Sequence, residues 1–456
     1  MSKIITFFLN LIGFGKGHVR SKRAQKNIFS SIIIRGFSIA LGLISMPLTI
    51  NYLEPEKYGI WITLSSIIAW FSFFDIGLGG GLRNKFAEAI AQNKQDLART
   101  YVSTTYAILL LIISVFMLMF YLVTPFISWN LILNVTTNVA TSSELKLLGV
   151  IIFTSFSISF VLKLITTILT ADQRPALASV FDLIGQILSV IIIIILIKTT
   201  QGSLIYLSIV YSSIPVLVLL SSSVWFFTGK YKIYRPAIKY IDFSKAKDLL
   251  NIGVKFFMLG IAVLLLYQTN VIVISQLFGP KEVTPYNVAF KYYSILSMGF
   301  GIIITPFWSA FTEAWVKHET LWIKKIMQKL FIIWGILFIV GVLMVVFSKW
   351  IFSIWIGDKV HITYIMSILI CTWVLINAWN GIFSNFLNGV SVLKLQMYCG
   401  LVGAIINVPL VIFLGKLIGI EGVLLANILV GLPAIIIYPI QYNKIIKSKA
   451  TGIWNK

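Results

Sequence analysis

Long apolar stretches alternate with short polar segments along the whole sequence. A helix needs about 20 residues to cross a hydrocarbon core of about 30 Å. We therefore predict twelve membrane-spanning helices, at approximately 27–53, 58–82, 98–123, 146–170, 177–197, 203–227, 250–275, 286–308, 326–347, 362–388, 395–418 and 420–442. The expected fold class is an all-α polytopic membrane protein.

The composition excludes an ordinary soluble protein. Hydrophobic residues make up 58% of the 456 residues and charged residues only 11%, and the mean hydropathy is +0.94. The two cysteines and three histidines are scattered, so we expect no disulfide, metal site or cofactor. The sequence also lacks the motifs of nucleotide-driven pumps and hydrolases, which argues against an enzyme.

The basic residues predict the orientation, because short cytoplasmic loops accumulate Lys and Arg. With both termini in the cytoplasm, 26 of the 37 basic residues lie in cytoplasmic segments, 7 in outward loops and 4 within spans. The net charge of +22 is then explained by topology and by attraction to anionic lipid headgroups. We expect membrane lipids, and no nucleic acid, as partners.

A single offset of 225 residues aligns unlike features of the two halves. The matched pairs are Pro55 and Pro280, Ser72 and Ser297, Phe86 and Phe311, Glu88 and Glu313, Ala89 and Ala314, and Arg99 and Lys324. Each half contains six predicted spans, and an even number returns the chain to the same side of the membrane. The halves are therefore predicted to be two six-helix lobes related as parallel repeats, which is a transporter plan.

This organisation divides the chain into five parts. They are an interfacial or cytoplasmic tail at 1–26, an N-terminal lobe at 27–227, a cytoplasmic connector at 228–249, a C-terminal lobe at 250–442 and a cytoplasmic tail at 443–456. Because one chain contains both lobes, a monomer suffices for transport.

A glycine-rich stretch, "FDIGLGGGLRNKFAEA" at 74–89, follows the second apolar run. Its glycine spacing and its position after a helix do not fit a phosphate-binding loop. We predict that the glycines end the second span, where they let the backbone turn and a neighbouring helix approach. The segment from Phe86 to Ala98 is then expected to be an amphipathic helix on the membrane surface.

The stretches "YLEPEKYGIW" and "FFDIGLGGGLRNKFAEAIAQ" resemble the second-span region of the oligosaccharide and O-antigen flippases. These proteins form the polysaccharide transporter branch of the multidrug/oligosaccharidyl-lipid/polysaccharide exporter superfamily. The resemblance implies a cargo of short sugar repeats on an undecaprenyl pyrophosphate carrier, a bacterial cytoplasmic (inner) membrane, and polysaccharide polymerase and chain-length proteins as partners. The second half keeps only Phe311, Glu313 and Ala314 of this motif.

Six ionisable residues fall within the predicted spans: Arg35, Asp75, Lys163, Asp182, Lys255 and Lys291. Each would cost roughly 2.5 to 3.5 kcal/mol at the centre of a lipid-facing helix, so most should face the protein interior or water. Arg35 shares its helix face with a stripe of small and polar residues, namely Ser31, Ser38, Gly42, Ser45 and Thr49. A second such stripe accompanies Lys291 and comprises Asn287, Ser294, Met298, Gly301 and Thr305. From the residues alone, Arg35 is either a ligand-facing cation or a structural partner of a carboxylate or carbonyl, and Lys291 either contacts the cargo or reaches the membrane interface. In the resembled flippases, cations on the first and eighth spans line the central cavity, which favours Arg35 and Lys291 as cavity cations.

The other four ionisable residues leave more than one interpretation open. Lys163 and Asp182 either pair with each other across neighbouring helices or act separately, Lys163 as a cavity cation and Asp182 in gating or ion coupling. Lys255 is either a further cavity cation or lies near enough to a helix end to reach the headgroups. Asp75 is predicted to form a structural or gating pair, with Arg35 or Arg83, or else to bind a coupling ion. The energy source stays open between H⁺, Na⁺ and the membrane potential.

The tenth span carries an uncharged polar stripe of Trp373, Asn377, Asn380, Ser384 and Asn388. Side-chain amides are unfavourable in hydrocarbon unless they find partners. Amides beside an indole ring suit sugar hydroxyls and the apolar face of a pyranose, whereas helix-to-helix hydrogen bonding is the competing interpretation. We therefore treat these residues as candidate sugar contacts.

Together these features predict an alternating-access flippase with a cationic cavity. Four intramembrane cations against two carboxylates leave an excess of two positive charges, which suits a pyrophosphate diester. A cation-coupled multidrug exporter of the same superfamily is the main alternative, although it would need an acidic pocket. A membrane-bound polymerase or ligase would need large outward loops, which the sequence lacks.

Overall fold

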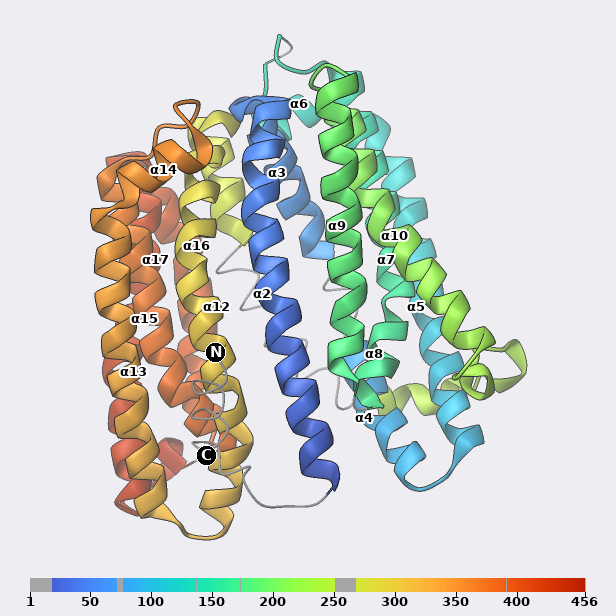
Figure 1. Cartoon of the computed structure of the whole chain (residues 1–456), viewed down its shortest axis with the longest axis vertical. Helices are drawn as coiled ribbons and strands as arrows, with labels where there is room; N and C mark the ends of the chain where they lie inside the picture. The colour runs from blue at the N-terminus through green and yellow to red at the C-terminus, as the bar shows by residue number, and fades with distance from the viewer. Residues whose placement is uncertain are drawn as a thin grey trace. The chain divides into compact units, whose positions relative to one another are not determined.

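The computed structural model describes residues 19–71, 77–136, 138–172, 174–250, 268–390 and 392–455, which are almost entirely helical (Figure 1). The helices of the first half are α2 (Val19–Leu53), α3 (Pro55–Ala69), α4 (Leu78–Ala91), α5 (Gln95–Val123), α6 (Trp129–Leu133), α7 (Ser142–Leu162), α8 (Leu164–Ala171), α9 (Pro175–Thr199) and α10 (Leu204–Thr228). Those of the second half are α12 (Pro280–Val316), α13 (Thr320–Val346), α14 (Ser348–Ile356), α15 (Tyr364–Gly389), α16 (Lys394–Ile418) and α17 (Ile420–Ile446).

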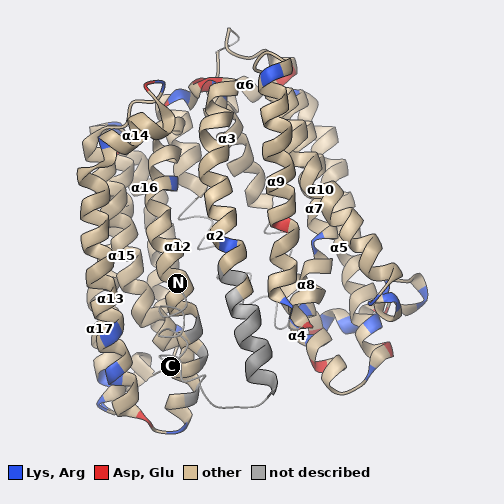
Figure 2. Ribbon diagram, in the orientation of Figure 1, with Lys and Arg blue, Asp and Glu red and all other residues tan. Residues whose placement is uncertain are grey.

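Ten helical segments within the described ranges are long and apolar enough to cross a membrane. They coincide with ten of the twelve predicted spans. The second predicted span is divided between α3 and α4, with 72–76 outside the described residues, and most of the seventh falls at 251–267, also outside them. Charged side chains are sparse along the long helices (Figure 2). The prediction of an all-α polytopic membrane protein is confirmed.

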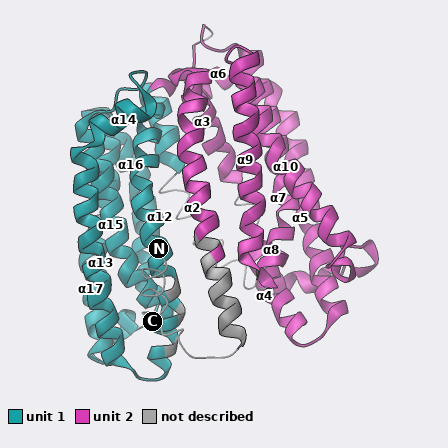
Figure 3. Ribbon diagram, in the orientation of Figure 1, with its two compact units in different colours: residues 1–25, 265–278, 282–456 teal, residues 26–264, 279–281 magenta. Residues whose placement is uncertain are grey.

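The described helices form two compact units (Figure 3). One, here called the N-lobe, contains α2 from Lys26 onward and all helices through α10, and the other, the C-lobe, contains α12 to α17 apart from the first residues of α12. Within the N-lobe, α7 packs on α10 and α4 packs on α5 and α8; within the C-lobe, α17 packs on both α15 and α16.

Backbone geometry confirms the parallel duplication at the predicted offset. Glu54 and Gly279, which have positive φ angles of 67° and 89°, precede the prolines that begin α3 and α12. The turns after α4 and α12 also correspond: Asn93 has a φ of 56°, and His318 has a φ of 59°. Their hydrogen bonds match as well, from Asn93 N to Ile90 O, Lys94 N to Ala89 O, His318 N to Trp315 O and Glu319 N to Ala314 O. Positive φ is uncommon for residues other than glycine, so these matches are specific.

The glycine-rich stretch begins a helix rather than ending one, which corrects the prediction for this region. Gly77 has a φ of 74° and caps the N-terminus of α4, so Gly79, Gly80 and Gly81 belong to the new helix. The expected close approach does occur, because a Cβ on Gly81 would lie 2.2 Å from the Leu249 carbonyl oxygen.

The amphipathic surface helix predicted from Phe86 to Ala98 is not formed. The chain turns between α4 and α5, at 92–94. Phe86, Ala89 and Ala98 are all buried in the N-lobe core. The error arose because three-to-four-residue spacing of apolar side chains looks the same whether the apolar face meets lipid or protein.

The predicted connector, 228–249, packs along α5 in three short 3₁₀ turns, η3 (Lys232–Tyr234), η4 (Ile238–Tyr240) and η5 (Phe243–Lys245). Arg99 on α5 donates a hydrogen bond of 3.1 Å to the Arg235 carbonyl oxygen, and its guanidinium lies 4.1 Å from the centre of the Tyr240 ring. The hydroxyls of Ser103 and Thr104 accept hydrogen bonds from connector backbone amides. The segment is therefore held on the N-lobe along much of its length.

Candidate functional site

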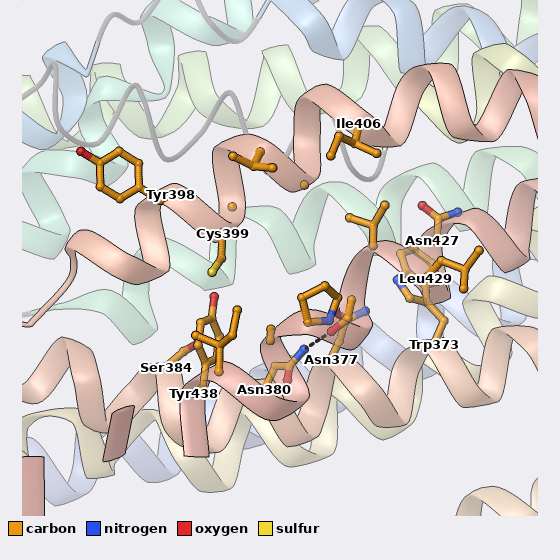
Figure 4. A pocket seen from close by; sticks show the side chains of 18 of the residues that line it. Trp373, Asn377, Asn380, Ser384, Tyr398, Cys399, Ile406, Asn427, Leu429 and Tyr438 are labelled. Carbon is orange, nitrogen blue, oxygen red and sulfur yellow. Dashed lines mark hydrogen bonds between the residues drawn. The ribbon is translucent and has the colours of Figure 1, made fainter. Parts of the chain in front are cut away.

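A cavity of about 620 Å³ lies among α15, α16 and α17 of the C-lobe (Figure 4). Four residues of the predicted stripe on α15 line it: Trp373, Asn377, Asn380 and Ser384. The fifth, Asn388, is not among the lining residues. Asn427 and Tyr438 of α17 and Tyr398 and Cys399 of α16 complete its polar wall. We call this cavity the C-lobe pocket.

The pocket brings together an aromatic ring and amides with unused hydrogen-bonding capacity. Asn380 donates a hydrogen bond of 3.2 Å from Nδ2 to the Gly431 carbonyl oxygen, whereas its Oδ1 is buried and has no hydrogen-bond partner in the described structure. The indole of Trp373 is buried, with its ring centre 5.6 Å from that of Phe290. An orphaned buried acceptor is costly unless a water or ligand donates to it.

A neighbouring amide pair serves the competing role of joining helices. Asn407 on α16 donates a hydrogen bond of 3.0 Å to Oδ1 of Asn427, whose Nδ2 donates to the Val423 carbonyl oxygen. Both side chains are almost fully buried. Sequence reasoning missed Asn427, although an amide in an otherwise apolar span is the kind of signal that marked the α15 stripe.

A second cavity, of about 420 Å³, lies in the N-lobe and is here called the N-lobe pocket. Arg83 of α4 and Lys163, at the junction of α7 and α8, are its two charged lining residues. Its other polar side chains are Thr166, Thr167 and Thr170, and Gly79 and Gly80 supply backbone. Arg83 was predicted as a gating residue and Lys163 as a cavity cation, but no local pattern predicted that they would line the same cavity.

The polar stripe on α2 contacts α10 at one end. The Thr49 hydroxyl is buried and lies 2.9 Å from the Tyr211 hydroxyl of α10, and the Ser45 hydroxyl donates to the Gly42 carbonyl oxygen. Arg35 is exposed and has no ion-pair partner among the residues that the structure describes. Its role as a cavity cation therefore stays a prediction.

The other predicted site residues differ in their exposure. Lys291 on α12 is half-buried, and two residues of its stripe, Met298 and Thr305, are exposed. Tyr293, on another face of α12, is buried in the C-lobe. Asp182 on α9 is exposed and forms no ion pair with Lys163 within the described ranges. Lys255 and Asp75 lie outside the described residues. A search of the described chain finds no group of three or more His, Cys, Asp or Glu placed to hold a metal.

The sequence matches the model of a family described as polysaccharide biosynthesis protein over residues 24–312, which is more than half of the chain. The chain belongs to this family. A Salmonella typhimurium protein named as an O-antigen transporter is 25% identical over 92% of this chain and 96% of its own length. A Yersinia pseudotuberculosis protein named as an O-antigen export protein is 22% identical over 78% of this chain and 81% of its own length.

Two solved structures show the same fold. An inward-facing multidrug resistance transporter of the MATE family, in the MOP superfamily, aligns with a TM-score of 0.75 at 12% identity over 91% of this chain and 96% of its own. The lipid II flippase MurJ, in an inward closed conformation, aligns with a TM-score of 0.70 at 17% identity over 90% of this chain and 87% of its own. The resemblance to the polysaccharide transporter branch is confirmed, and this family member is a multi-pass membrane protein whose named relatives are transporters.

Proposed function

We propose that this protein flips oligosaccharide repeat units linked to undecaprenyl pyrophosphate from the cytoplasmic to the outer face of a bacterial inner membrane. The product would feed the synthesis of O-antigen, capsule or exopolysaccharide. The C-lobe pocket is the observation that carries the proposal, because it joins an indole and several amides without any charged side chain. Membership of a polysaccharide biosynthesis family and the fold shared with a lipid II flippase support the same cargo class.

The C-lobe pocket suits a sugar for physical reasons. Its volume lies in the range of ordinary small-molecule sites. Sugar hydroxyls both donate and accept, so they complement the buried Asn380 Oδ1 and the amide groups of Asn377 and Asn380. The faces of a pyranose are apolar and pack on an aromatic ring such as Trp373. A cationic drug, in contrast, would find no carboxylate among the described residues that line this pocket.

The cationic residues would hold the pyrophosphate while the lobes rock between inward-open and outward-open states. Arg35, Lys163, Lys255 and Lys291 supply the charge, and Asp75 and Asp182 are the residues available for gating or for binding a coupling ion. The membrane potential, negative inside, would assist outward movement of the anion by roughly 2.3 kcal/mol per charge per 100 mV.

Deletion of the gene in its host tests the cargo. Loss of surface polysaccharide with accumulation of intact lipid-linked repeats in the membrane is expected, and wild-type protein should reverse both effects. Arg35→Ala should insert normally yet fail to restore export. Unchanged polysaccharide together with new drug sensitivity would overturn the proposal in favour of the cation-coupled multidrug exporter.

Two alanine variants on one helix test the sugar site. Trp373→Ala and Asn380→Ala should each reduce export at least about tenfold, because each removes a contact that positions the sugar. Asn388→Ala is the matched control, since Asn388 is half-buried on the same helix but does not line the pocket. Equal losses in all three variants, at equal amounts of membrane protein, would show that the α15 amides only join helices.

A further inference from the structure

The N-lobe pocket has the charge and the donors of a phosphate site. The described residues that line it include two cations, Arg83 and Lys163, and no carboxylate. Neither cation belongs to an ion pair within the described ranges, whereas Lys85, two residues from Arg83 on α4, pairs with Glu88 at 2.9 Å. Two cations beside one cavity repel each other, and an anion bound between them would offset that repulsion.

Lys163 lies at the junction of α7 and α8, within one continuous apolar segment, and it keeps helical backbone angles (φ −61°, ψ −17°). Its carbonyl oxygen accepts hydrogen bonds from the Thr166 amide and hydroxyl, at 2.9 and 2.7 Å, so the helix tightens locally there. Lys163 and the threonines of this turn line the same cavity.

The first turn of α4, a 14-residue helix whose N-cap is Gly77, also lines the cavity. Gly79 and Gly80 of that turn line the pocket, and because glycine has no Cβ, an anion can approach the backbone there. The partial positive charge of a helix N-terminus adds to that of Arg83 and Lys163. Both side chains and the helix end therefore favour the same ligand charge.

The pocket's charge does not follow from the duplicated backbone. The end of α8 and the end of α15 have the same local hydrogen bonds, at positions 218 residues apart. At this offset of 218, Lys163 corresponds to Gly381, and Thr166 corresponds to Ser384. Gly381 and Ser384 line the uncharged C-lobe pocket. The two cavities thus use corresponding positions of corresponding spans for different chemistry.

We propose that the N-lobe pocket binds a phosphoryl group through Arg83 and Lys163. The guanidinium presents paired N–H donors to two phosphate oxygens, and the ammonium contributes a compact charge and three donors. This site adds a phosphate contact to the proposed flippase, and it rests on the proposed function only for the identity of the cargo. The phosphoryl group belongs either to the pyrophosphate of the lipid carrier or to the headgroup of an anionic phospholipid.

A binding measurement on the purified full chain tests this site without any transport. The protein is placed in nanodiscs of zwitterionic lipid, and inorganic pyrophosphate is titrated by microscale thermophoresis. Arg83→Gln and Lys163→Gln should each weaken binding by about tenfold or more, and Lys163→Arg should retain it. Lys85→Gln, which removes one positive charge from the same helix outside the pocket, should change the Kd less than about twofold.

Competition distinguishes the two sources of the phosphoryl group. If phosphatidylglycerol displaces pyrophosphate from wild type but binds the Arg83→Gln variant weakly, the site takes a phospholipid headgroup. If pyrophosphate binds equally well in nanodiscs with phosphatidylglycerol, the site takes the carrier. Binding that is unchanged in both glutamine variants, or weakened equally by Lys85→Gln, would overturn the site. Because binding is measured directly, these results do not depend on whether the protein proves to be a flippase or a drug exporter.

Discussion

The junctions that follow α8 in the N-lobe and α15 in the C-lobe have the same backbone hydrogen bonds, but their side chains are charged in the first and apolar in the second. The Asp172 amide donates to the Ile168 carbonyl oxygen at 2.9 Å, and the corresponding Val390 amide donates to the Phe386 carbonyl oxygen at 3.0 Å. The next bonds also correspond, from Arg174 N to Leu169 O and from Val392 N to Leu387 O. The segments after α10 and α17 repeat this match, with bonds from Tyr231 N to Phe226 O and from Lys449 N to Lys444 O, each 2.8 Å long.

An ion cluster stabilises the N-lobe junction. Asp172 Oδ2 accepts hydrogen bonds from Lys230 at 3.0 Å and from the Tyr231 hydroxyl at 2.5 Å, and Arg174 Nε lies 3.1 Å from it. Burial alone would raise the pKa of Asp172, but the hydrogen bonds from Tyr231 and Lys230 and the charge of Arg174 outweigh it and hold that pKa below its ordinary value.

The C-lobe junction is apolar instead. Val390 and Val392 are buried in the hydrophobic core of that lobe. The same main-chain turn is therefore stabilised by charge in one half and by apolar burial in the other. Duplication preserved the path of the backbone, while the side chains diverged, as they also did in the two pockets.

Placing a carboxylate at the C-lobe junction should have the largest effect. Val390→Asp places a carboxylate in the hydrophobic core of the C-lobe, where Val390 is buried, and we expect the buried charge to destabilise the protein by about 3 to 5 kcal/mol. Thermal unfolding of the purified protein in detergent measures this as a large drop in Tm. Val390→Ala, which only removes methyl groups, is the control, and equal Tm values for the two variants would contradict an apolar junction.

Removing the carboxylate from the N-lobe junction should have a smaller effect. Asp172→Ala leaves Lys230 and Arg174 without their partner, but all three side chains are partly exposed and screened by solvent. We expect a loss of about 1 to 2 kcal/mol. The control is Glu88→Ala, which breaks the more exposed pair with Lys85 and should change the Tm little. A larger loss of Tm for Glu88→Ala than for Asp172→Ala would show that the ion cluster stabilises the protein no more than an exposed ion pair does.

The cluster also predicts a dependence on pH. Because the pKa of Asp172 is lowered on folding, its contribution is fully present above the ordinary aspartate pKa of about 3.9 and is lost as the pH falls through the folded value. The Tm difference between wild type and Asp172→Asn should therefore be constant near neutral pH and shrink below about pH 4. A difference that grew as the pH fell would have the wrong sign.

The features that the sequence predicted are those with local causes. Apolar length located the spans, and the three-to-four-residue spacing of Trp373, Asn377, Asn380 and Ser384 placed them together in one cavity wall. Contacts between distant segments were not predictable in this way. The opposite wall, with Asn427, depends on which face α17 turns toward α15.

Other long-range contacts have the same explanation. The contacts of the connector with α5 were not predicted, because the α5 hydroxyls that bind its backbone lie 134 and 138 residues earlier in the sequence. A pair between Lys163 and Asp182 was one of the interpretations, because their helices were expected to be neighbours. Such a pair depends on how α7 and α9 are rotated relative to each other, which helical spacing does not determine. Contacts along one helix could be predicted from residue spacing, whereas contacts between helices distant in the sequence could not.

Tyr231→Phe should have the smallest effect. It removes only one of the contacts to Asp172, the hydroxyl hydrogen bond of 2.5 Å, and leaves the ring in the N-lobe core, so we expect a loss of about 1 kcal/mol. The double variant Asp172→Ala/Tyr231→Phe should be no less stable than Asp172→Ala alone, since the hydroxyl then has no carboxylate to donate to. Additive losses in that cycle of Tm measurements would mean that the Tyr231 hydroxyl stabilises the junction through a partner other than Asp172, and the N-lobe junction would then depend less on the ion cluster than its charges suggest.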